Sequence, residues 1–210
     1  MSKQSKKWVL AVFALSLGAP AICTGQPVAE APVFKVGDYW ELRQTVTQTN
    51  TPGDRETQWS RKIAEIGPDR IQVTWGDGKV WPYDAAMNFI PEGKPEYTRI
   101  LVRYPLKAGS EWTYTRKFPN PMLEEKGDAK VVAVESITVP AGTFECFRVD
   151  VKAEFGARSY QQRNTWSRWY CPKIKWIAKE RHETYIYDVT KGGGSTTVET
   201  SELVKFTPGQ

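Results

Sequence analysis

Side chains that commonly carry out catalysis are sparse in this sequence. It contains a single histidine, His182, within Lys179-Glu180-Arg181-His182-Glu183. One histidine cannot build a multi-histidine metal site, and Glu180 and Glu183 fall on opposite faces of a strand. A Ser–His–Asp arrangement with Asp188 stays open, although there is no Gly-x-Ser-x-Gly motif. We therefore expect an exposed strand histidine, no catalytic residue, no metal site and no cofactor.

Three carboxylates are the remaining candidates for acid–base chemistry. Glu145, Asp150 and Glu154 lie close together in the chain. A hydrolase would need two such groups in environments that separate their pKa values. Their spacing gives no argument for this, so an envelope hydrolase is the least favoured alternative.

Tryptophan is unusually frequent, with nine residues in the chain. Indole faces can stack on sugar rings or line a lipid-sized cavity, but they also fill the cores of β-domains. Four tryptophans fall on apolar strand faces and are assigned to the core: Trp40, Trp75, Trp112 and Trp166. Trp8 belongs to the N-terminal apolar run, and the remaining four are the candidates for a ligand-binding surface: Trp59, Trp81, Trp169 and Trp176.

One predicted strand is basic. Lys173, Lys175, Lys179 and Arg181 share a face if residues 173–181 are extended. Such a face could contact anionic lipid headgroups or an acidic polymer. It could equally be the solvated side of a half-buried strand or the charge that protects a sheet edge.

Two cysteines follow the N-terminal segment, and they are predicted to form a disulfide. Placing Cys146 opposite Cys171 pairs the segments Thr143–Phe155 and Tyr160–Tyr170. In that register Glu154 lies opposite Arg163, Asp150 opposite Ser167, Lys152 opposite Thr165, Val151 opposite Trp166, and Phe147 opposite Tyr170. One register thus satisfies a polar face, an apolar face and a charge pair. Two separately buried thiols are the alternative.

Nearly every segment alternates polar and apolar residues and ends at turn residues, which predicts strands. The remaining predicted strands are Tyr39–Thr49, Trp59–Ile66, Ile71–Trp75, Val80–Tyr83, Tyr97–Tyr104, Glu111–Phe118, Ala129–Val139, Lys175–Tyr187 and Ser195–Phe206. Gly76-Asp77-Gly78 predicts a hairpin. Only Asn120–Gly127 and Asp84–Asn88 suggest a helical turn. About eleven short strands predict an all-β fold, an antiparallel barrel or strongly curved sandwich.

The chain contains a faint internal repeat. Phe34–Leu42 aligns without gaps on Leu106–Tyr114, and each segment has a lysine, a turn glycine and a strand that opens with tryptophan. Two related β-meanders would explain this, with half-repeats at 33–104 and 105–206 inside one domain spanning 26–210. Chance similarity in a tryptophan-rich chain is the alternative.

The first 25 residues have the layout of a secretory signal peptide. Three lysines precede an apolar run, Trp8–Leu17, and small residues then lead to a cleavage site expected after Gly25, or after Ala21. Cys23 raises the alternative of a lipid anchor, although Ile22 precedes it where a small residue is usual. Without the three lysines the excess positive charge falls from five to two, so basicity is no argument for nucleic-acid binding. No later segment is long and apolar enough to be a transmembrane helix.

The second half resembles an exported bacterial family catalogued as a domain of unknown function, DUF3108-like. The resemblance covers about residues 105–206 and rests on Gly109–Tyr114, Glu135–Val149, with its Val-Pro-Ala-Gly-Thr-Phe core, and Trp169–Ile177. It implies an envelope protein with a strongly curved antiparallel sheet, and some members are lipoproteins. The family supplies no catalytic residue. Members usually have Gly-Val-Gly-like residues where this chain has Lys173–Trp176.

Together these features predict an exported, periplasmic, non-catalytic binding or assembly module. An aromatic concave surface would hold a lipid or a glycan, and the basic strand would lie near an anionic partner. The alternative from another class is a structural subunit that adds a sheet edge to an envelope complex.

Overall fold

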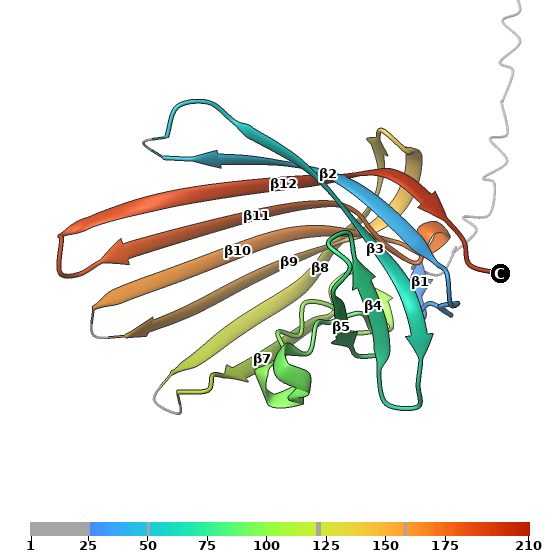
Figure 1. Cartoon of the computed structure of the whole chain (residues 1–210), viewed down its shortest axis with the longest axis horizontal. Coiled ribbons are helices and arrows are strands. Elements are labelled where there is room, and N and C mark those ends of the chain that lie inside the picture. Colours follow the sequence, from blue (N-terminus) through green and yellow to red (C-terminus); the bar gives the residue numbers. More distant parts are fainter. Residues whose placement is uncertain (1–25, 50, 121–122, 158) are drawn as a thin grey trace, which may run out of the picture.

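The structure is a computed structural model that describes residues 26–49, 51–120, 123–157 and 159–210. The predicted signal peptide, both cleavage positions and Cys23 lie outside the described residues. The described residues form twelve strands and three short 3-10 turns (Figure 1). The strands are β1 (Val28–Ala29), β2 (Tyr39–Gln48), β3 (Arg55–Ile66), β4 (Ile71–Trp75), β5 (Val80–Tyr83), β6 (Leu106–Lys107), β7 (Glu111–Lys117), β8 (Glu124–Val139), β9 (Gly142–Ala157), β10 (Tyr160–Cys171), β11 (Trp176–Asp188) and β12 (Gly193–Thr207). The turns are η1 (Pro91–Gly93), η2 (Pro95–Tyr97) and η3 (Pro172–Ile174).

Ten of the strands form one antiparallel sheet in the order β5-β4-β3-β2-β12-β11-β10-β9-β8-β7, and β1 pairs with β6 beside it. Figure 1 shows β8 to β12 as long, curved neighbours, with β3, β4 and β5 crossing at one end. The all-β fold is confirmed. No pairing between the edge strands β5 and β7 is present in the described residues, so the sheet is strongly curved but is not a closed barrel.

Several predicted elements are wrong. The helical turn at Asn120–Gly127 is contradicted because β8 already begins at Glu124. Pairing with β7 and β9 outweighs the local signals of proline and glycine there. Residues 98–104 are not a strand, because Leu101 and Val102 donate their backbone N–H groups to the side chain of Asn88 rather than to a neighbouring strand.

The segment 84–105 covers one part of the sheet. Its backbone carbonyls accept hydrogen bonds from side chains of the sheet, Ile100 from Trp112 at 2.8 Å and Leu101 from Tyr170 at 3.3 Å. Asn88 is buried and also donates to the carbonyl of Val102. This covering segment therefore closes the apolar core against β7 and β10.

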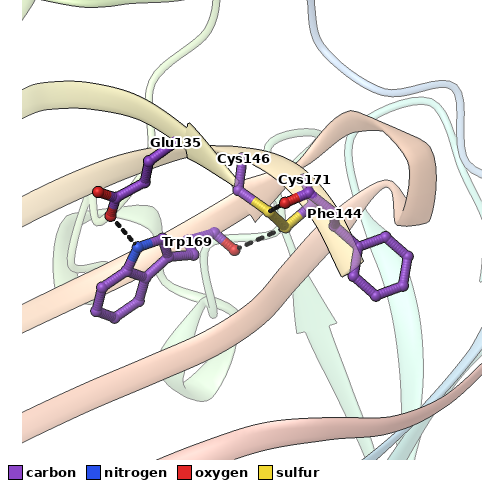
Figure 2. Close-up of a disulfide and its surroundings, with 5 residues drawn as sticks. All are labelled: Glu135, Phe144, Cys146, Trp169 and Cys171. Carbon is purple, nitrogen blue, oxygen red and sulfur yellow. Dashed lines mark hydrogen bonds between the residues drawn. A yellow bond between two sulfur atoms is a disulfide. The ribbon is translucent and has the colours of Figure 1, made fainter. Parts of the chain in front are cut away.

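The predicted disulfide and its register are confirmed (Figure 2). Cys146 and Cys171 are bonded, with their Cα atoms 4.2 Å apart. All five predicted cross-strand pairs are present: Glu154–Arg163, Asp150–Ser167, Lys152–Thr165, Val151–Trp166 and Phe147–Tyr170. The prediction succeeded because a one-residue slip would have moved every apolar side chain to the other face.

The two segments of the suspected repeat have matching backbone geometry. Gly37 and Gly109 adopt φ values of 91° and 88°, which glycine tolerates without steric cost. Gly37 N–H donates to the carbonyl of Ile63 at 2.8 Å, and Gly109 N–H donates to that of Val131 at 2.7 Å. Both acceptor strands shift register just after these residues. The half-repeats themselves stay a prediction.

Candidate functional site

The strand register defines an inner face of the sheet. One row of directly opposed residues runs Trp112, Ala129, Val151, Trp166, His182, Glu199, Val46 and Arg55. Its first four members are buried in the core, and directly opposed residues share a face. His182, Glu199 and Arg55 therefore lie on the face that carries the core, which we call the inner face.

The inner face changes from apolar to polar along each row. In the next row Val149 is followed by Arg168, Glu180, Ser201, Gln44 and Thr57. The row on the other side contains Asn164, Thr184, Thr197 and Gln48. The apolar part lies on β7 to β10, where the covering segment makes its hydrogen bonds to Trp112 and Tyr170. The polar part lies on β11, β12, β2 and β3.

A groove of about 680 Å³ opens on this polar part. Its inner-face lining is Gln44, Thr57, Trp59, Arg61, Trp75, Glu180, Glu199 and Ser201. It is also bounded by Gly76, Asp77 and four residues that alternate to the opposite face of β2 and β3, namely Tyr39, Glu41, Gln58 and Ser60. Its residues come from β2, β3, β4, β11, β12 and the turn between β4 and β5. The groove thus combines indole rings with hydroxyl, amide and charged groups.

Arg61 is the central cation of the groove. Its guanidinium carbon lies 4.7 Å from the ring centroids of Trp59, Trp75 and Trp176, and 5.5 Å from that of Tyr83. Its Nε is buried and has no hydrogen-bond partner among the described residues. Burial lowers the pKa of Arg61, although arginine remains protonated at any physiological pH. Four ring faces hold this side chain in place by cation–π attraction.

The neighbouring charges on the inner face are paired. Glu180 forms an ion pair with Arg168, and the two side chains are 17% and 16% exposed. Glu199 lies 3.4 Å from Nδ1 of His182. The hydrogen bond from His182 lowers the pKa of Glu199, although burial opposes this shift.

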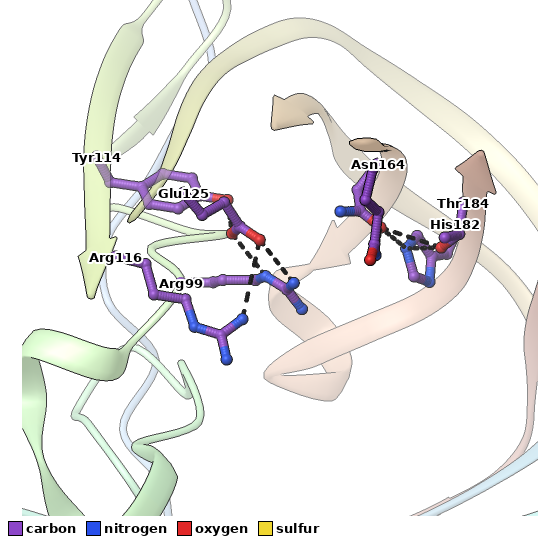
Figure 3. Close-up of polar contacts among 8 residues, drawn as sticks. Arg99, Tyr114, Arg116, Glu125, Asn164, His182 and Thr184 are labelled. Carbon is purple, nitrogen blue, oxygen red and sulfur yellow. Dashed lines mark hydrogen bonds and ion pairs between the residues drawn. The ribbon is translucent and has the colours of Figure 1, made fainter. Parts of the chain in front are cut away.

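His182 belongs to a polar network (Figure 3). Its ring stacks on Trp166 with centroids 4.6 Å apart, and its Nε2 lies 3.3 Å from Oδ1 of Asn164 and 3.0 Å from Oγ1 of Thr184. The prediction of an exposed histidine is therefore wrong, because the side chain is only 18% exposed. Asn164 is buried, and its Nδ2 has no partner in the described part of the chain.

A second polar cluster fastens the covering segment to the sheet. Glu125 is fully buried and accepts two hydrogen bonds of 2.7 Å from Arg99, as well as one of 3.2 Å from Tyr114 (Figure 3). Arg116 lies 3.9 Å from the same carboxylate. Arg99 also lies over the Trp166 ring, 5.2 Å from its centroid. This cluster therefore links the covering segment to the histidine network through Trp166.

The four predicted ligand-binding tryptophans do not form one surface. Trp59 lines the groove, and Trp176 lies behind it, 2% exposed and therefore part of the core. Trp81 packs against Phe89 of the covering segment, with ring centroids 5.6 Å apart. Trp169 lies on the opposite face of the sheet and donates its indole N–H to Glu135 (Figure 2).

The four predicted basic residues also separate. Residues 172–174 form η3 and Lys175 adopts a left-handed conformation with φ of 62°, so β11 begins only at Trp176. Lys175 turns to the buried Asp38, at 2.8 Å, while Lys173 stays exposed. Lys179 pairs with Glu202 at 2.9 Å, and Arg181 with Glu183 at 2.8 Å. The predicted continuous basic face is therefore absent from this region, which the structure describes without gaps.

The three carboxylates considered for hydrolysis are not brought together. Asp150 is bonded to Arg148 at 2.9 Å, and Glu154 is paired with Arg163 at 3.2 Å. Among the described residues, no group of three or more His, Cys, Asp or Glu side chains is arranged to hold a metal ion. The described residues also contain no helix that is long and apolar enough to span a membrane.

Sequence reasoning missed Arg61 and assigned Trp75 to the core, although Trp75 is only partly buried and lines the groove. A signal for Arg61 was present, because it lies two residues after Trp59 and two before Ile63 on the same strand face. A cation between two apolar residues on one strand face indicates a candidate binding residue. Its contacts with Trp176 and Tyr83 come from distant strands, which no local pattern reveals.

Comparison with known proteins confirms the resemblance noted in the sequence. Residues 114–186 match the model of the DUF3108-like family, a domain of unknown function. No curated protein matches the chain.

Three solved structures are similar in outline. A protein described as exported, with a YmcC-like fold, from Bacteroides fragilis is 15% identical at a TM-score of 0.45, over 85% of this chain and 99% of that one. A protein described as a lipoprotein from Parabacteroides distasonis is 14% identical at 0.45, over 87% and 100%. The hypothetical lipoprotein YmcC from Escherichia coli is 10% identical at 0.40, over 80% and 85%. None of these likenesses assigns a role to a residue of this chain.

Proposed function

We propose that this chain is a non-catalytic binding protein of the bacterial cell envelope and that it holds a ligand in the groove of the inner face. The groove carries this proposal, because its volume of about 680 Å³ lies within the range of about 300–1,000 Å³ that is usual for small-molecule sites. It also pairs indole rings with polar groups, the combination that fixes the orientation of a bound ligand. Of the predicted ligand-binding residues, the proposal keeps Trp59 and adds Arg61 and Trp75.

The envelope location is supported by two independent features. The predicted signal peptide at residues 1–25 would export the chain. The Cys146–Cys171 disulfide is typical of proteins in oxidising compartments such as the periplasm. A periplasmic protein is the form that we propose, and attachment through a lipid on Cys23 is the alternative.

A binding role rather than a catalytic one is supported by the state of the acidic groups at the groove. Glu180 is ion-paired with Arg168, and Glu199 is hydrogen-bonded to His182. His182 is in turn stacked on Trp166. Groups that are held in this way suit a rigid, preorganised surface, which lowers the entropic cost of binding a ligand.

The proposal is tested by native mass spectrometry of the protein purified from the periplasm without detergent. A bound ligand appears as an additional mass in a fixed ratio to the protein, and organic or aqueous extraction then gives its chemical class. We expect one such mass for each chain. A bare chain in every preparation, and no extractable molecule, would contradict a binding function.

A further inference from the structure

Arg61 is a cation that Glu180 attracts, but Glu180 is itself ion-paired with Arg168. No hydrogen bond or ion pair of its guanidinium is present within the described residues, although arginine offers five N–H donors. Its immediate contacts are the faces of Trp59, Trp75, Trp176 and Tyr83. Ring faces attract the positive charge but accept no strong hydrogen bond. The Nη donors of Arg61 are therefore available to a ligand, whereas its Nε is buried.

The carboxylates that line the groove already have partners. Glu41 accepts a hydrogen bond from Gln58, and Asp77 is 3.1 Å from Lys79. Glu180 is ion-paired with Arg168, and Glu199 is hydrogen-bonded to His182, as described above. Glu41 keeps its charge because Gln58 is neutral, but no carboxylate of the described groove lining forms an ion pair with Arg61.

A partly buried guanidinium without an anion is unfavourable, because a desolvated charge lacks compensation. A planar, fixed fork of N–H donors matches the two oxygens of a carboxylate or a phosphate. We propose that Arg61 is the anchor for an anionic group, a carboxylate or a phosphate, on the ligand of the groove. This inference rests on the proposed binding function and adds the charge of the ligand to it.

The rest of the groove indicates what carries the anion. Gln44, Thr57 and Ser201 share one cross-strand row of the inner face and offer amide and hydroxyl groups. Thr57 donates to Gln44 at 3.4 Å, but an acyl chain would still displace the water around these polar groups without replacing its hydrogen bonds, at an energetic cost. Sugar hydroxyls would satisfy them, while the indole rings of Trp59 and Trp75 pack against the apolar face of a sugar ring. The ligand class is therefore an acidic sugar rather than a lipid.

We call the four rings around Arg61 its aromatic cage. Three of them are tryptophans, so their fluorescence should report a ligand that binds at Arg61. Intrinsic fluorescence is recorded while the purified protein is titrated with galacturonate, galactose, inorganic phosphate or vesicles of phosphatidylglycerol. We expect saturable changes with galacturonate or phosphate, at least about tenfold tighter than with galactose. Tighter binding of galacturonate would indicate a site for a carboxylate, and tighter binding of phosphate would indicate a site for a phosphate. Equal binding of galactose, a response to vesicles alone, or no saturable response would overturn the proposal.

Two variants test the residue. Arg61→Gln should weaken binding of the preferred anion at least about tenfold, and Arg61→Lys should weaken it less, because lysine keeps the charge but loses the fork. Arg163→Gln, an exposed arginine paired with Glu154, is the matched control and should bind normally. Near-ultraviolet circular dichroism verifies that each variant is folded. If folded Arg61→Gln binds like the wild type, the anchor role is wrong. A neutral ligand found by native mass spectrometry would refute this inference and leave the binding function standing.

Discussion

Removing the Cys146–Cys171 disulfide should destabilise the protein mainly through its unfolded state. The bond closes a loop with a sequence separation of 25 residues. The loop-entropy relation then gives about 3.5 kcal/mol at 25 °C. The folded state should change little, because β9 and β10 keep the two positions adjacent through their own ladder. For a chain of this size the loss corresponds to a fall of about 7–14 °C in Tm.

The assay compares thermal unfolding of the oxidised wild type, the reduced wild type and the double variant Cys146→Ala/Cys171→Ala. The reduced wild type is the control for the sulfur atoms, which are lost only in the variant. Urea unfolding should also give a larger m-value without the bond, because the unfolded chain exposes more surface. If both bond-free forms melt within about 2 °C of the oxidised protein, the loop-entropy reasoning is wrong.

Three further changes test the buried polar groups. Glu125→Gln leaves two guanidinium groups without their carboxylate and should lower the free energy of unfolding, measured in urea, by about 3 kcal/mol. An unchanged free energy of unfolding would mean that this cluster does not hold the covering segment on the sheet. Burial raises the pKa of Asp38, but the hydrogen bonds that its carboxylate accepts outweigh this effect and lower the pKa. The ionised carboxylate therefore stabilises the fold above about pH 4, and this stabilisation is lost as the pH falls through the folded pKa. The difference in unfolding free energy between wild type and Asp38→Asn should narrow in acid, and a difference that widens would contradict this. Gly127→Ala places a Cβ against the ring of Tyr114 and should cost about 1–3 kcal/mol in thermal unfolding, whereas an unchanged Tm would show that the ring moves freely.

Local pairing was the most predictable part of the fold. β9 and β10 are consecutive in the chain, so the disulfide, the charge pair and the apolar face could be tested against one register. The same alternation gave Ile71–Trp75 and Val80–Tyr83 with their observed bounds. Whether the sheet closes into a barrel was not predictable, because closure depends on whether the edge strands β5 and β7 pair, and no local pattern reveals this.

The covering segment shows why local patterns failed elsewhere. Residues 97–104 have strand-like composition, but the side chain of Asn88 accepts the N–H groups of Leu101 and Val102. The carbonyls of Ile100 and Leu101 accept hydrogen bonds from side chains of the sheet. These partners become neighbours only after folding. For the same reason the sequence placed Lys175 in a strand, whereas its contact with Asp38 joins distant parts of the chain.

The candidate site was predictable only in its residue types. Aromatic rings on a concave sheet were expected, and Trp59 was among them. The cage around Arg61 requires β3, β4, β5 and β11 to converge, so no spacing in the sequence reveals it. The pairing of Glu199 with His182 likewise depends on the register of β11 and β12.

The central claim is that the groove of the inner face holds a ligand. Native mass spectrometry of the detergent-free wild type and of Thr57→Trp tests it most directly, because Thr57 is exposed and lines the groove, so a bulky indole there would block it without disturbing the core. We predict an additional mass on the wild type that is lost or strongly reduced in the folded variant. The same additional mass on both proteins, or on neither, would contradict the account.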